Sequence, residues 1–269
     1  MNRVATIMRT ELIGVERFDH PADHVHRDPP EEVSGAHSLS FLERGTFDVA
    51  VGRRRWRLRP GMVFRTWPGL TYRCCHLEKT PADICLTVSY QPDFVEEIQG
   101  RAHRNTAVVA SPTNRLAYLG LRLSRIAAPG ADALALETLA AELLSETASP
   151  EDRSHRFRVP QLRWYAERVE AARAMLDSEF AEPHTLGSLA RRAGMSPFHF
   201  ARVFRELVGV PPHRYLTNVR LERAAERLRA GAGVTETALD CGIGNLSHFI
   251  RLFRRAYGVP PSRFPTVTN

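Results

Sequence analysis

The last third of this 269-residue chain contains one pattern twice, and this repeat limits the fold more than any other feature. Residues Ala190–Gly194 match Ala238–Gly242 at an offset of 48, and after one inserted residue the offset becomes 49. Both copies close on Gly-Val-Pro-Pro, which begins at Gly209 and at Gly258. Glycines and prolines that recur in register predict two supersecondary units built in the same way.

Each copy reads as a short helix, a turn and a second helix. The short helices are expected over Leu186–Ala193 and Val234–Cys241. Gly194 and Gly242 follow them and suit the left-handed conformation that commonly ends a helix. Ser196 and Asn245 can then accept a backbone N–H as N-caps of the second helices. This order is that of a helix-turn-helix, whose second helix lies in the major groove of DNA.

The second helices separate apolar side chains from arginines, and a long helix joins the two copies. The expected core positions are Phe200, Val203, Phe204, Phe249, Leu252 and Phe253. Residues 212–229 read as mostly uninterrupted helix, which spans about 26 Å at ~1.5 Å per residue. With the width of the flanking helices, this spacer brings the recognition helices near the ~34–36 Å that separate successive major grooves. One chain can therefore read two adjacent groove segments.

Positive charge is concentrated in the same region. Residues 161–269 carry 16 arginines and no lysine against 10 acidic residues, whereas residues 1–160 have a net charge of +1. The planar donor fork of arginine suits phosphate oxygens and guanine edges better than lysine does. A basic C-terminal third indicates a polyanionic partner.

These residues resemble the AraC/XylS family of bacterial transcription regulators. The stretch from Leu186 to Arg205 resembles the family's first helix-turn-helix, and the stretch from Thr237 to Ser262 resembles its second. The resemblance covers roughly residues 163–265, with one departure at Ile243, where the family usually places Phe. It implies promoter DNA as the partner of this half, effector binding by the other half, and activation through contact with RNA polymerase.

The resemblance also assigns roles to residues of the two recognition helices. The positions expected to contact bases are Phe198, Ala201 and Arg202 in the first helix, and Leu246, Ser247, Ile250 and Arg251 in the second. Arg205 and Arg254 are expected to contact phosphates. Arg202 and Arg251 are the main candidates for guanine, since a bidentate arginine contact discriminates by about 1–3 kcal/mol. A phosphate contact or a solvated helix face is the alternative for each.

The first half of the chain has the pattern of a β domain. Strands are expected over His37–Leu42, Phe47–Val51, Arg54–Leu58, Met62–Thr66, Tyr72–Leu77 and Ile84–Tyr90. In the last of these, the even-numbered apolar residues share one face, opposite Cys85, Thr87 and Ser89. Short strands at even spacing favour a small antiparallel barrel or sandwich. Turns such as Arg59-Pro60-Gly61 resemble those of the family's cupin-like sensing barrel.

Two helices follow the strands. Leu116, Leu119, Leu123 and Ile126 recur at the 3-4-3 spacing of a coiled-coil seam. That seam can pair with a second copy of the chain, or it can pack on the barrel or on the helix containing Leu136–Leu144. A homodimer is the preferred interpretation, because a two-fold partner doubles the phosphate contacts.

The sequence thus predicts an α+β chain of four parts. They are a cupin-like, effector-sensing antiparallel β-barrel over 1–111, a helical hairpin over 112–147, a linker over 148–160, and an all-α domain with two helix-turn-helix motifs over 161–269.

Three residue clusters in the first half are candidates for a metal site, a thiol site or a nucleic-acid site. His24, His26 and Glu31 have the spacing of a cupin metal motif. The motif's glycines are missing and Tyr72 stands where its second half has a histidine, so we expect a solvated loop with no metal and no cofactor.

Cysteines and arginines form the other two clusters. A thiol sensor or a soft-metal site is one interpretation of the cluster Cys74, Cys75, His76 and Cys85. In that interpretation, Cys75 and Cys85 approach each other across strands. Buried packing is preferred for these cysteines, as it is for Cys241. The arginines of residues 53–59 suit an exposed strand better than a second nucleic-acid site.

Composition sets the remaining limits. With 43% hydrophobic and 25% charged residues, the chain is typical of globular proteins. No apolar run is long enough to span a membrane, and four cysteines are too few for a disulfide scaffold, so a cytoplasmic location is expected. No Ser-His-Asp set, phosphate loop or paired catalytic carboxylates indicate an enzyme. The competing hypotheses are a metal-dependent cupin enzyme and a DNA-repair or redox sensor that uses its cysteines.

Overall fold

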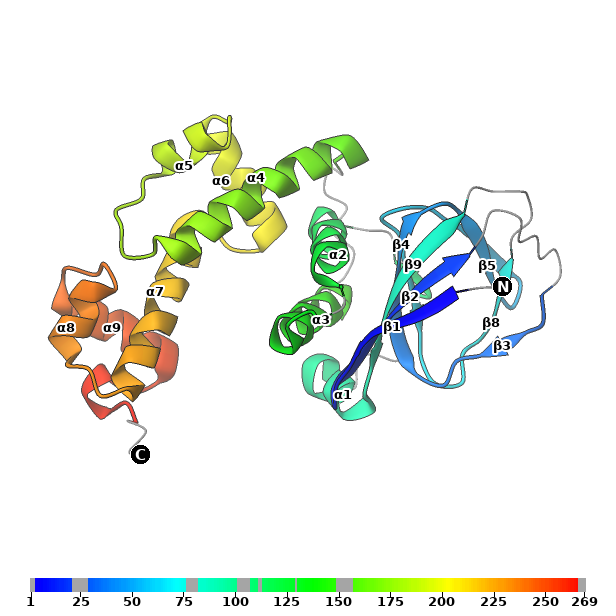
Figure 1. Ribbon diagram of the computed structural model, residues 1–269, viewed down its shortest axis with the longest axis horizontal. Coiled ribbons are helices and arrows are strands. Elements are labelled where there is room, and N and C mark those ends of the chain that lie inside the picture. Colours follow the sequence, from blue (N-terminus) through cyan, green and yellow to red (C-terminus); the bar gives the residue numbers. More distant parts are fainter. Residues whose placement is uncertain are drawn as a thin grey trace. The chain divides into compact units, whose positions relative to one another are not determined.

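The computed structural model describes residues 3–20, 29–75, 82–100, 107–110, 113–128, 130–148 and 157–265. The chain divides into two compact units, Met1–Leu162 and Arg163–Asn269. The first unit combines antiparallel sheets with helices, and the second is helical throughout (Figure 1). The predicted fold class, α+β with an antiparallel β domain followed by an all-α domain that holds two helix-turn-helix motifs, is therefore confirmed.

The described strands of the first unit form two antiparallel sheets. The six-stranded sheet has the order β1 (Arg3–Arg9), β2 (Ile13–His20), β9 (Asp83–Tyr90), β4 (His37–Arg44), β7 (Val63–Thr66) and β10 (Val109–Ala110). The four-stranded sheet has the order β3 (Glu32–Val33), β8 (Thr71–Cys75), β5 (Phe47–Val51) and β6 (Arg54–Leu58). Within the described residues the two sheets form an open sandwich rather than a closed barrel.

The six expected strands are all present, with ends that shift by up to two residues where they are described. Residues 76 and 77, at the end of the fifth expected strand, lie outside the described residues. The sequence interpretation missed β1 and β2 and the two-residue strands β3 and β10. Ile13 of β2 lies opposite Tyr90 of β9, a pairing between strands far apart in sequence. Local alternation carries no information about such a partner.

The six-stranded sheet uses its two faces differently. Along β4, Leu39 and Phe41 are buried on the face that the helices cover, where Phe41 lies against Gly120 of α2. Ser38 and Ser40 point to the other face, toward the four-stranded sheet. Alternation along a strand thus separates an apolar helix-binding face from a polar inner face.

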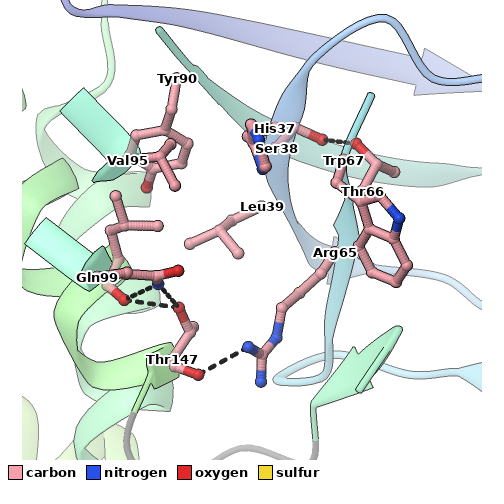
Figure 2. A pocket seen from close by; sticks show the side chains of 11 residues that line it. His37, Ser38, Leu39, Arg65, Thr66, Trp67, Tyr90, Val95, Gln99 and Thr147 are labelled. Carbon is pink, nitrogen blue, oxygen red and sulfur yellow. Dashed lines mark hydrogen bonds between the residues drawn. The ribbon is translucent and has the colours of Figure 1, made fainter. Parts of the chain in front are cut away.

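Three helices cover the outer face of this sheet: α1 (Pro92–Gln99), α2 (Asn114–Ile126) and α3 (Ala133–Ala148). Figure 2 shows a contact that joins α3 to the sheet and another that joins α1 to α3. Arg65 of β7 donates from Nη1 to the carbonyl oxygen of Thr147 at 2.7 Å, and Gln99 donates from Nε2 to that of Leu144 at 2.6 Å. The buried Tyr90 hydroxyl donates to the carbonyl of Ala140. The hairpin is therefore part of the first unit's core.

This packing corrects the predicted role of the leucine seam. Leu116, Leu119 and Leu123 are 3%, 0% and 0% exposed, because α2 packs on both α3 and the sheet within one chain. A seam that is already buried has no apolar face to offer a second copy. The 3-4-3 spacing describes the narrow buried side of a helix in a layer as well as it describes a coiled coil.

The second unit contains six α-helices and one 3₁₀ turn in its described part. They are α4 (Val159–Ser178), α5 (Leu186–Arg192), α6 (Pro197–Val208), α7 (Pro212–Arg229), α8 (Val234–Asp240), α9 (Leu246–Tyr257) and η2 (Pro261–Arg263). α7 lies between the two repeats, with α5 and α6 near one end and α8 and α9 near the other (Figure 1). α4 begins at Val159, inside the segment predicted as a linker, of which residues 149–156 lie outside the described residues.

The turns of the two copies match the expected geometry. Ser196 caps α6 by accepting from the N–H of His199, and Asn245 caps α9 by accepting from that of His248. Gly194 and Gly242 have φ of +65° and +70°. The two short helices end one residue earlier than expected, which leaves the predicted helix-turn-helix order intact.

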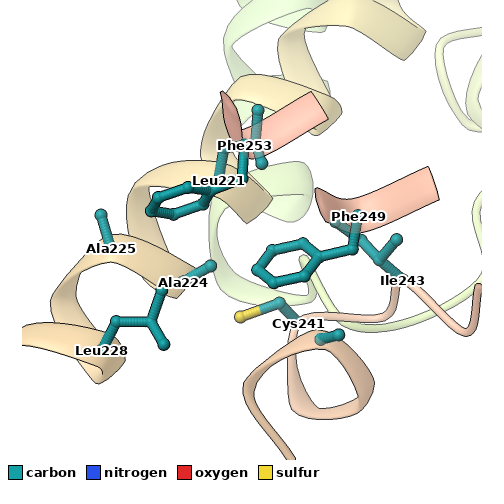
Figure 3. Packing of buried hydrophobic residues seen from close by; sticks show 9 residues of the cluster. Leu221, Ala224, Ala225, Leu228, Cys241, Ile243, Phe249 and Phe253 are labelled. Carbon is teal, nitrogen blue, oxygen red and sulfur yellow. The ribbon is translucent and has the colours of Figure 1, made fainter. Parts of the chain in front are cut away.

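The second copy closes around an apolar cluster that Figure 3 shows. Phe249 and Phe253 of α9 are fully buried against Leu221 and Leu228 of α7. Ile243, at the position where the family usually has Phe, is 7% exposed in the same cluster. Cys241 is also buried there, which confirms its expected packing role. Phe249 and Phe253 are thus core residues.

Candidate nucleic-acid interface

The recognition helices α6 and α9 each have one buried and one exposed side. Phe200 and Phe204 of α6 are fully buried, as are Phe249 and Phe253 at the matching positions of α9. Pairs of phenylalanines four residues apart fix which side of each helix turns inward. The opposite side of each helix therefore faces outward at a known rotation.

The outward sides contain the residues that were predicted to contact DNA. Phe198 is 81% exposed, which is unusual for a large apolar side chain on a monomer surface. Of the predicted base-contacting residues, six are exposed and one is half-buried: Phe198, Arg202, Leu246, Ser247, Ile250 and Arg251 are exposed, and Ala201 is half-buried. Arg205 and Arg254, predicted to contact phosphates, are exposed as well.

The arginines on these outward sides differ in their partners from three arginines elsewhere in the unit. Arg173 pairs with Glu170 at 2.9 Å, Arg223 with Glu226 at 3.0 Å, and Arg227 with Asp240. The structure shows no ion pair to a carboxylate of the described chain for any of four recognition-helix arginines: Arg202, Arg205, Arg251 and Arg254. Unpaired guanidinium groups carry their full positive charge to an approaching polyanion.

The sequence of α9 explains part of this difference. The segment Leu246–Tyr257 contains three arginines and no Asp or Glu, and α6 contains a single acidic residue, Glu206. No carboxylate on α9 can therefore neutralise its arginines through an i,i+3 or i,i+4 pair. Both helices present a positive outward surface.

The first recognition helix carries a contact network that sequence reasoning missed. The Tyr165 hydroxyl of α4 lies 2.9 Å from Nε2 of His199, and Nδ1 of His199 lies 3.4 Å from Nη2 of Arg202. The Tyr165 ring packs edge-on against the imidazole. A histidine three residues before an arginine on one helix gave the signal for half of this network, but the tyrosine comes from another helix.

The two copies are joined by contacts besides α7 itself. Arg220 of α7 donates to the carbonyl oxygens of Phe180 and Glu182, in the turn that follows α4. Phe180 packs against the core of the second copy. Tyr215, near the start of α7, donates to the carboxylate of Asp177, and burial raises the pKa of its hydroxyl. These contacts fix α4 and its turn to α7.

A second candidate site lies between the two sheets of the first unit. This cavity of about 600 Å³ is large enough for a small organic molecule. Phe18, Phe47, Phe64 and Tyr72 supply aromatic walls. On the six-stranded sheet, two hydroxyl pairs face the cavity: Ser38 with Thr66 at 2.8 Å, and Ser40 with Thr87 at 2.9 Å.

The charges at this cavity are few. His20 contacts the buried carboxylate of Asp83 at 3.0 Å, and the Tyr72 hydroxyl donates to Glu32 at 3.1 Å. Burial, reinforced by Glu32, raises the pKa of Tyr72, so its hydroxyl stays protonated at neutral pH. The described lining contains neither Lys nor Arg. It therefore offers no permanent cation for a carboxylate or phosphate.

The cysteines are arranged differently from the predicted pair. Cys74 and Cys85 line the cavity, whereas Cys75 and Cys85 belong to strands of different sheets and do not pair across neighbouring strands. Burial raises the pKa of the Cys74 and Cys85 thiols, so both stay protonated and weakly nucleophilic at neutral pH. This environment favours packing over thiol chemistry.

The remaining clusters offer no built metal or anion site in the described chain. No three His, Cys, Asp or Glu side chains among the described residues lie close enough together to hold a metal ion. Glu31 is exposed, while His24, His26 and His76 lie outside the described residues. Arg57 pairs with Asp48 at 3.0 Å, and Arg54 and Arg55 are exposed on the edge strand β6, as an exposed strand requires.

Comparisons with known proteins agree with the geometry of the second unit. A family profile described as a helix-turn-helix domain matches residues 189–266. An uncharacterized HTH-type transcriptional regulator of Bacillus subtilis, YbfI, is 25% identical over 81% of this chain and 80% of its own length. The HTH-type transcriptional regulator Rv1931c of Mycobacterium tuberculosis is 45% identical over 23% of this chain and 24% of its own.

Among solved structures, a probable AraC family transcriptional regulator from Rhodopseudomonas palustris is 31% identical, with a TM-score of 0.35. The match covers 36% of this chain and 94% of that one. In the described part of this chain, no helix is both long and apolar enough to cross a bilayer.

Proposed function

Because this chain belongs to the AraC family of DNA-binding transcriptional regulators, we propose that it inserts α6 and α9 into successive major grooves of one promoter site. The observation that carries this proposal is the set of exposed arginines without carboxylate partners on both recognition helices. Phosphate neutralisation by such residues supplies most of the affinity for duplex DNA.

The length of α7 supports simultaneous binding in two grooves. Its 18 residues span about 27 Å at ~1.5 Å per residue. Adding the helices at its two ends approaches the ~34–36 Å between successive major grooves on one side of B-DNA. Two half-sites one helical turn apart are therefore the expected operator.

Each predicted contact residue has a chemical role in this mode of binding. Arg202 and Arg251 read guanine through O6 and N7, while Arg205 and Arg254 hold phosphates. Four of the remaining base-contacting residues are apolar and suit thymine methyl groups: Phe198, Ala201, Leu246 and Ile250. Ser247 can hydrogen-bond to a base edge through its hydroxyl. The two helices differ in these residues, so the two half-sites differ in sequence.

The cavity of the first unit is the proposed effector site. Aromatic walls, paired hydroxyl groups and the lack of a described Lys or Arg favour an uncharged or cationic molecule with an aromatic part. Effector occupancy would then control DNA binding or contact with RNA polymerase, with activation as the proposed outcome. A homodimer is proposed as well, through a surface other than the buried leucine seam.

Selection from random duplexes tests the DNA-binding part. The purified full-length protein is incubated with random double-stranded DNA, and the bound fraction is sequenced over several rounds. We expect two unlike half-sites with centres about 10–10.5 base pairs apart. Enrichment of a single half-site, or of no sequence, would contradict binding in two grooves.

A pair of probes of matched shape tests the effector part. 2-Phenylethylamine and phenylacetate have similar size and opposite charge. We expect the amine to raise the thermal-unfolding midpoint of the first unit at millimolar concentration, because ligand binding stabilises the folded state. Phenylacetate should leave the midpoint unchanged, and a larger increase with phenylacetate would refute the charge argument.

A further inference from the structure

Three side chains from two helices form a continuous chain of contacts on the first recognition helix. Tyr165 of α4 is 6% exposed, and its hydroxyl lies 2.9 Å from Nε2 of His199. Nδ1 of His199 lies 3.4 Å from Nη2 of Arg202, which is exposed on the outward side of α6. The network thus runs from a buried anchor to a solvent-facing guanidinium.

The chemistry of these groups fixes the protons. A guanidinium can only donate, so Nδ1 of His199 must accept from Arg202 and carries no proton. The proton of the neutral imidazole then lies on Nε2, where it is donated to the Tyr165 oxygen. Only this one tautomer satisfies both contacts.

We propose that Tyr165 and His199 are positioning residues, which hold Arg202 in place for its base before DNA arrives. This inference rests on the proposed function, in which Arg202 reads a guanine. A long arginine side chain loses rotamer freedom when it binds, and one that is already oriented loses less. The network therefore raises the preference of Arg202 for its base over the other bases.

The second copy provides an internal comparison. His248 and Arg251 occupy the positions of His199 and Arg202, at the offset of 49. Within the described chain, however, the His248 ring makes no hydrogen bond, and it lines a small hollow with Thr217 and Arg220 of α7. Among the described residues, no tyrosine hydrogen-bonds to the His248 ring. Arg202 is thus oriented before DNA binds, whereas Arg251 is not.

The network also makes the first reader sensitive to acid. The ionisable side chains in contact with the His199 ring are Tyr165 from α4 and Arg202 on its own helix. Protonation places an N–H on Nδ1, which faces the guanidinium with like charge and removes the acceptor. Protonation of His199 therefore releases Arg202.

The experiment measures base preference rather than affinity alone. Duplexes selected by the full-length parent protein are varied at each position, and relative affinities are measured at about pH 8 and about pH 5.5, which bracket imidazole titration. The base read by Arg202 is the position whose preference Arg202→Ala abolishes.

We expect Tyr165→Phe to lower that preference about three- to tenfold, a part of the roughly 5- to 150-fold that a bidentate arginine contact provides. It retains the buried ring. In the parent the preference should fall on acidification, whereas in His199→Ala it should be low at both pH values. His248→Ala, the matched control, should leave this preference and its pH dependence unchanged.

The outcomes separate the two proposals. A parent protein that selects no paired half-sites contradicts the proposed function. A parent that selects them, with an unchanged preference in both Tyr165→Phe and His199→Ala, overturns the positioning role alone. Circular dichroism shows whether Tyr165→Phe is folded. If it is not, the test is the base preference at the two pH values: a preference that falls with acid in the parent and is low at both pH values in His199→Ala supports the positioning role, and equal preferences in both proteins overturn it.

Discussion

At the scale of single residues, a carboxylate partner indicates that an arginine has a structural role, and an exposed arginine without one is available to bind DNA. Arg227 is half-buried and Arg254 is exposed on their helices; Arg227 is neutralised by Asp240, whereas Arg254 has no carboxylate partner in the described chain. The sequence gives no hint of this, because Asp240 lies on a different helix. The core positions were predictable, since Phe249 and Phe253 repeat with helical spacing.

Two neighbouring arginines of α9 test the division between reading and anchoring. Arg251→Ala is expected to weaken binding to the selected site by about 1–3 kcal/mol and to relax the preference at one position. Arg254→Ala is expected to weaken binding to all sequences equally and to reduce the salt dependence by about one phosphate contact. Titrations of matched and mismatched duplexes at several salt concentrations measure both.

The comparison of the two variants can contradict the assignment of Arg251 to a base and Arg254 to a phosphate. Each variant serves as the control for the other, because both lose one arginine from the same exposed helix. Equal loss on every sequence with Arg251→Ala would make it a phosphate contact.

At the scale of elements, the two glycine turns look alike in sequence and differ in surroundings. A Cβ at Gly194 would meet no atom within 4 Å, whereas a Cβ at Gly242 would collide with the carbonyl group of Ala181, in the turn after α4. Arg220 holds that turn in place through the carbonyls of Phe180 and Glu182. The turn of the second copy is therefore packed against the segment between α4 and α5, which lies outside both copies.

This difference predicts unequal costs for one substitution. Gly194→Ala should lower the free energy of unfolding by about 1–2 kcal/mol, the cost of a left-handed conformation for alanine. Gly242→Ala should cost about 3 kcal/mol or more, because the collision with Ala181 adds to the same conformational cost. Urea unfolding followed by helical circular dichroism measures both, and equal losses would show that the turn after α4 yields easily.

Elements with a local signal were predictable, and elements defined by distant partners were not. Local sequence signals placed both ends of α5, α7 and α8, and the starts of α6 and α9, within one residue, and alternation placed six strands. The pairing of β1 and β2 with the rest of the sheet, and the burial of Leu119 under α3, depend on contacts with distant segments. The cavity is similarly hidden from sequence, because its lining residues come from both sheets.

At the scale of the whole molecule, the helical unit has its own apolar core. Its clusters contain residues of α7, α8 and α9 together with Phe180. A unit that buries its own core can fold by itself. We therefore expect residues 161–269, expressed alone, to show a cooperative thermal transition and to bind DNA more weakly than the full chain.

The salt dependence of the association constant measures how many phosphates the isolated helical unit and the intact protein each contact. The logarithm of the association constant should fall by about 0.9 for each neutralised phosphate per unit of log salt. The isolated unit should show a slope equal to that of the intact protein if the protein binds as a monomer, and about half of it if a dimer binds. A slope near zero would refute phosphate contacts altogether.

The helix α7 has a consequence for the evolution of the promoters that such a regulator controls. A continuous rod of 18 residues cannot stretch or rotate one of its ends against the other. On the proposed mode of binding, mutations that change bases between the half-sites are tolerated, but insertion or deletion of a single pair swings one half-site out of reach. Genomes should therefore preserve the number of base pairs between the half-sites more strictly than the sequence of those base pairs.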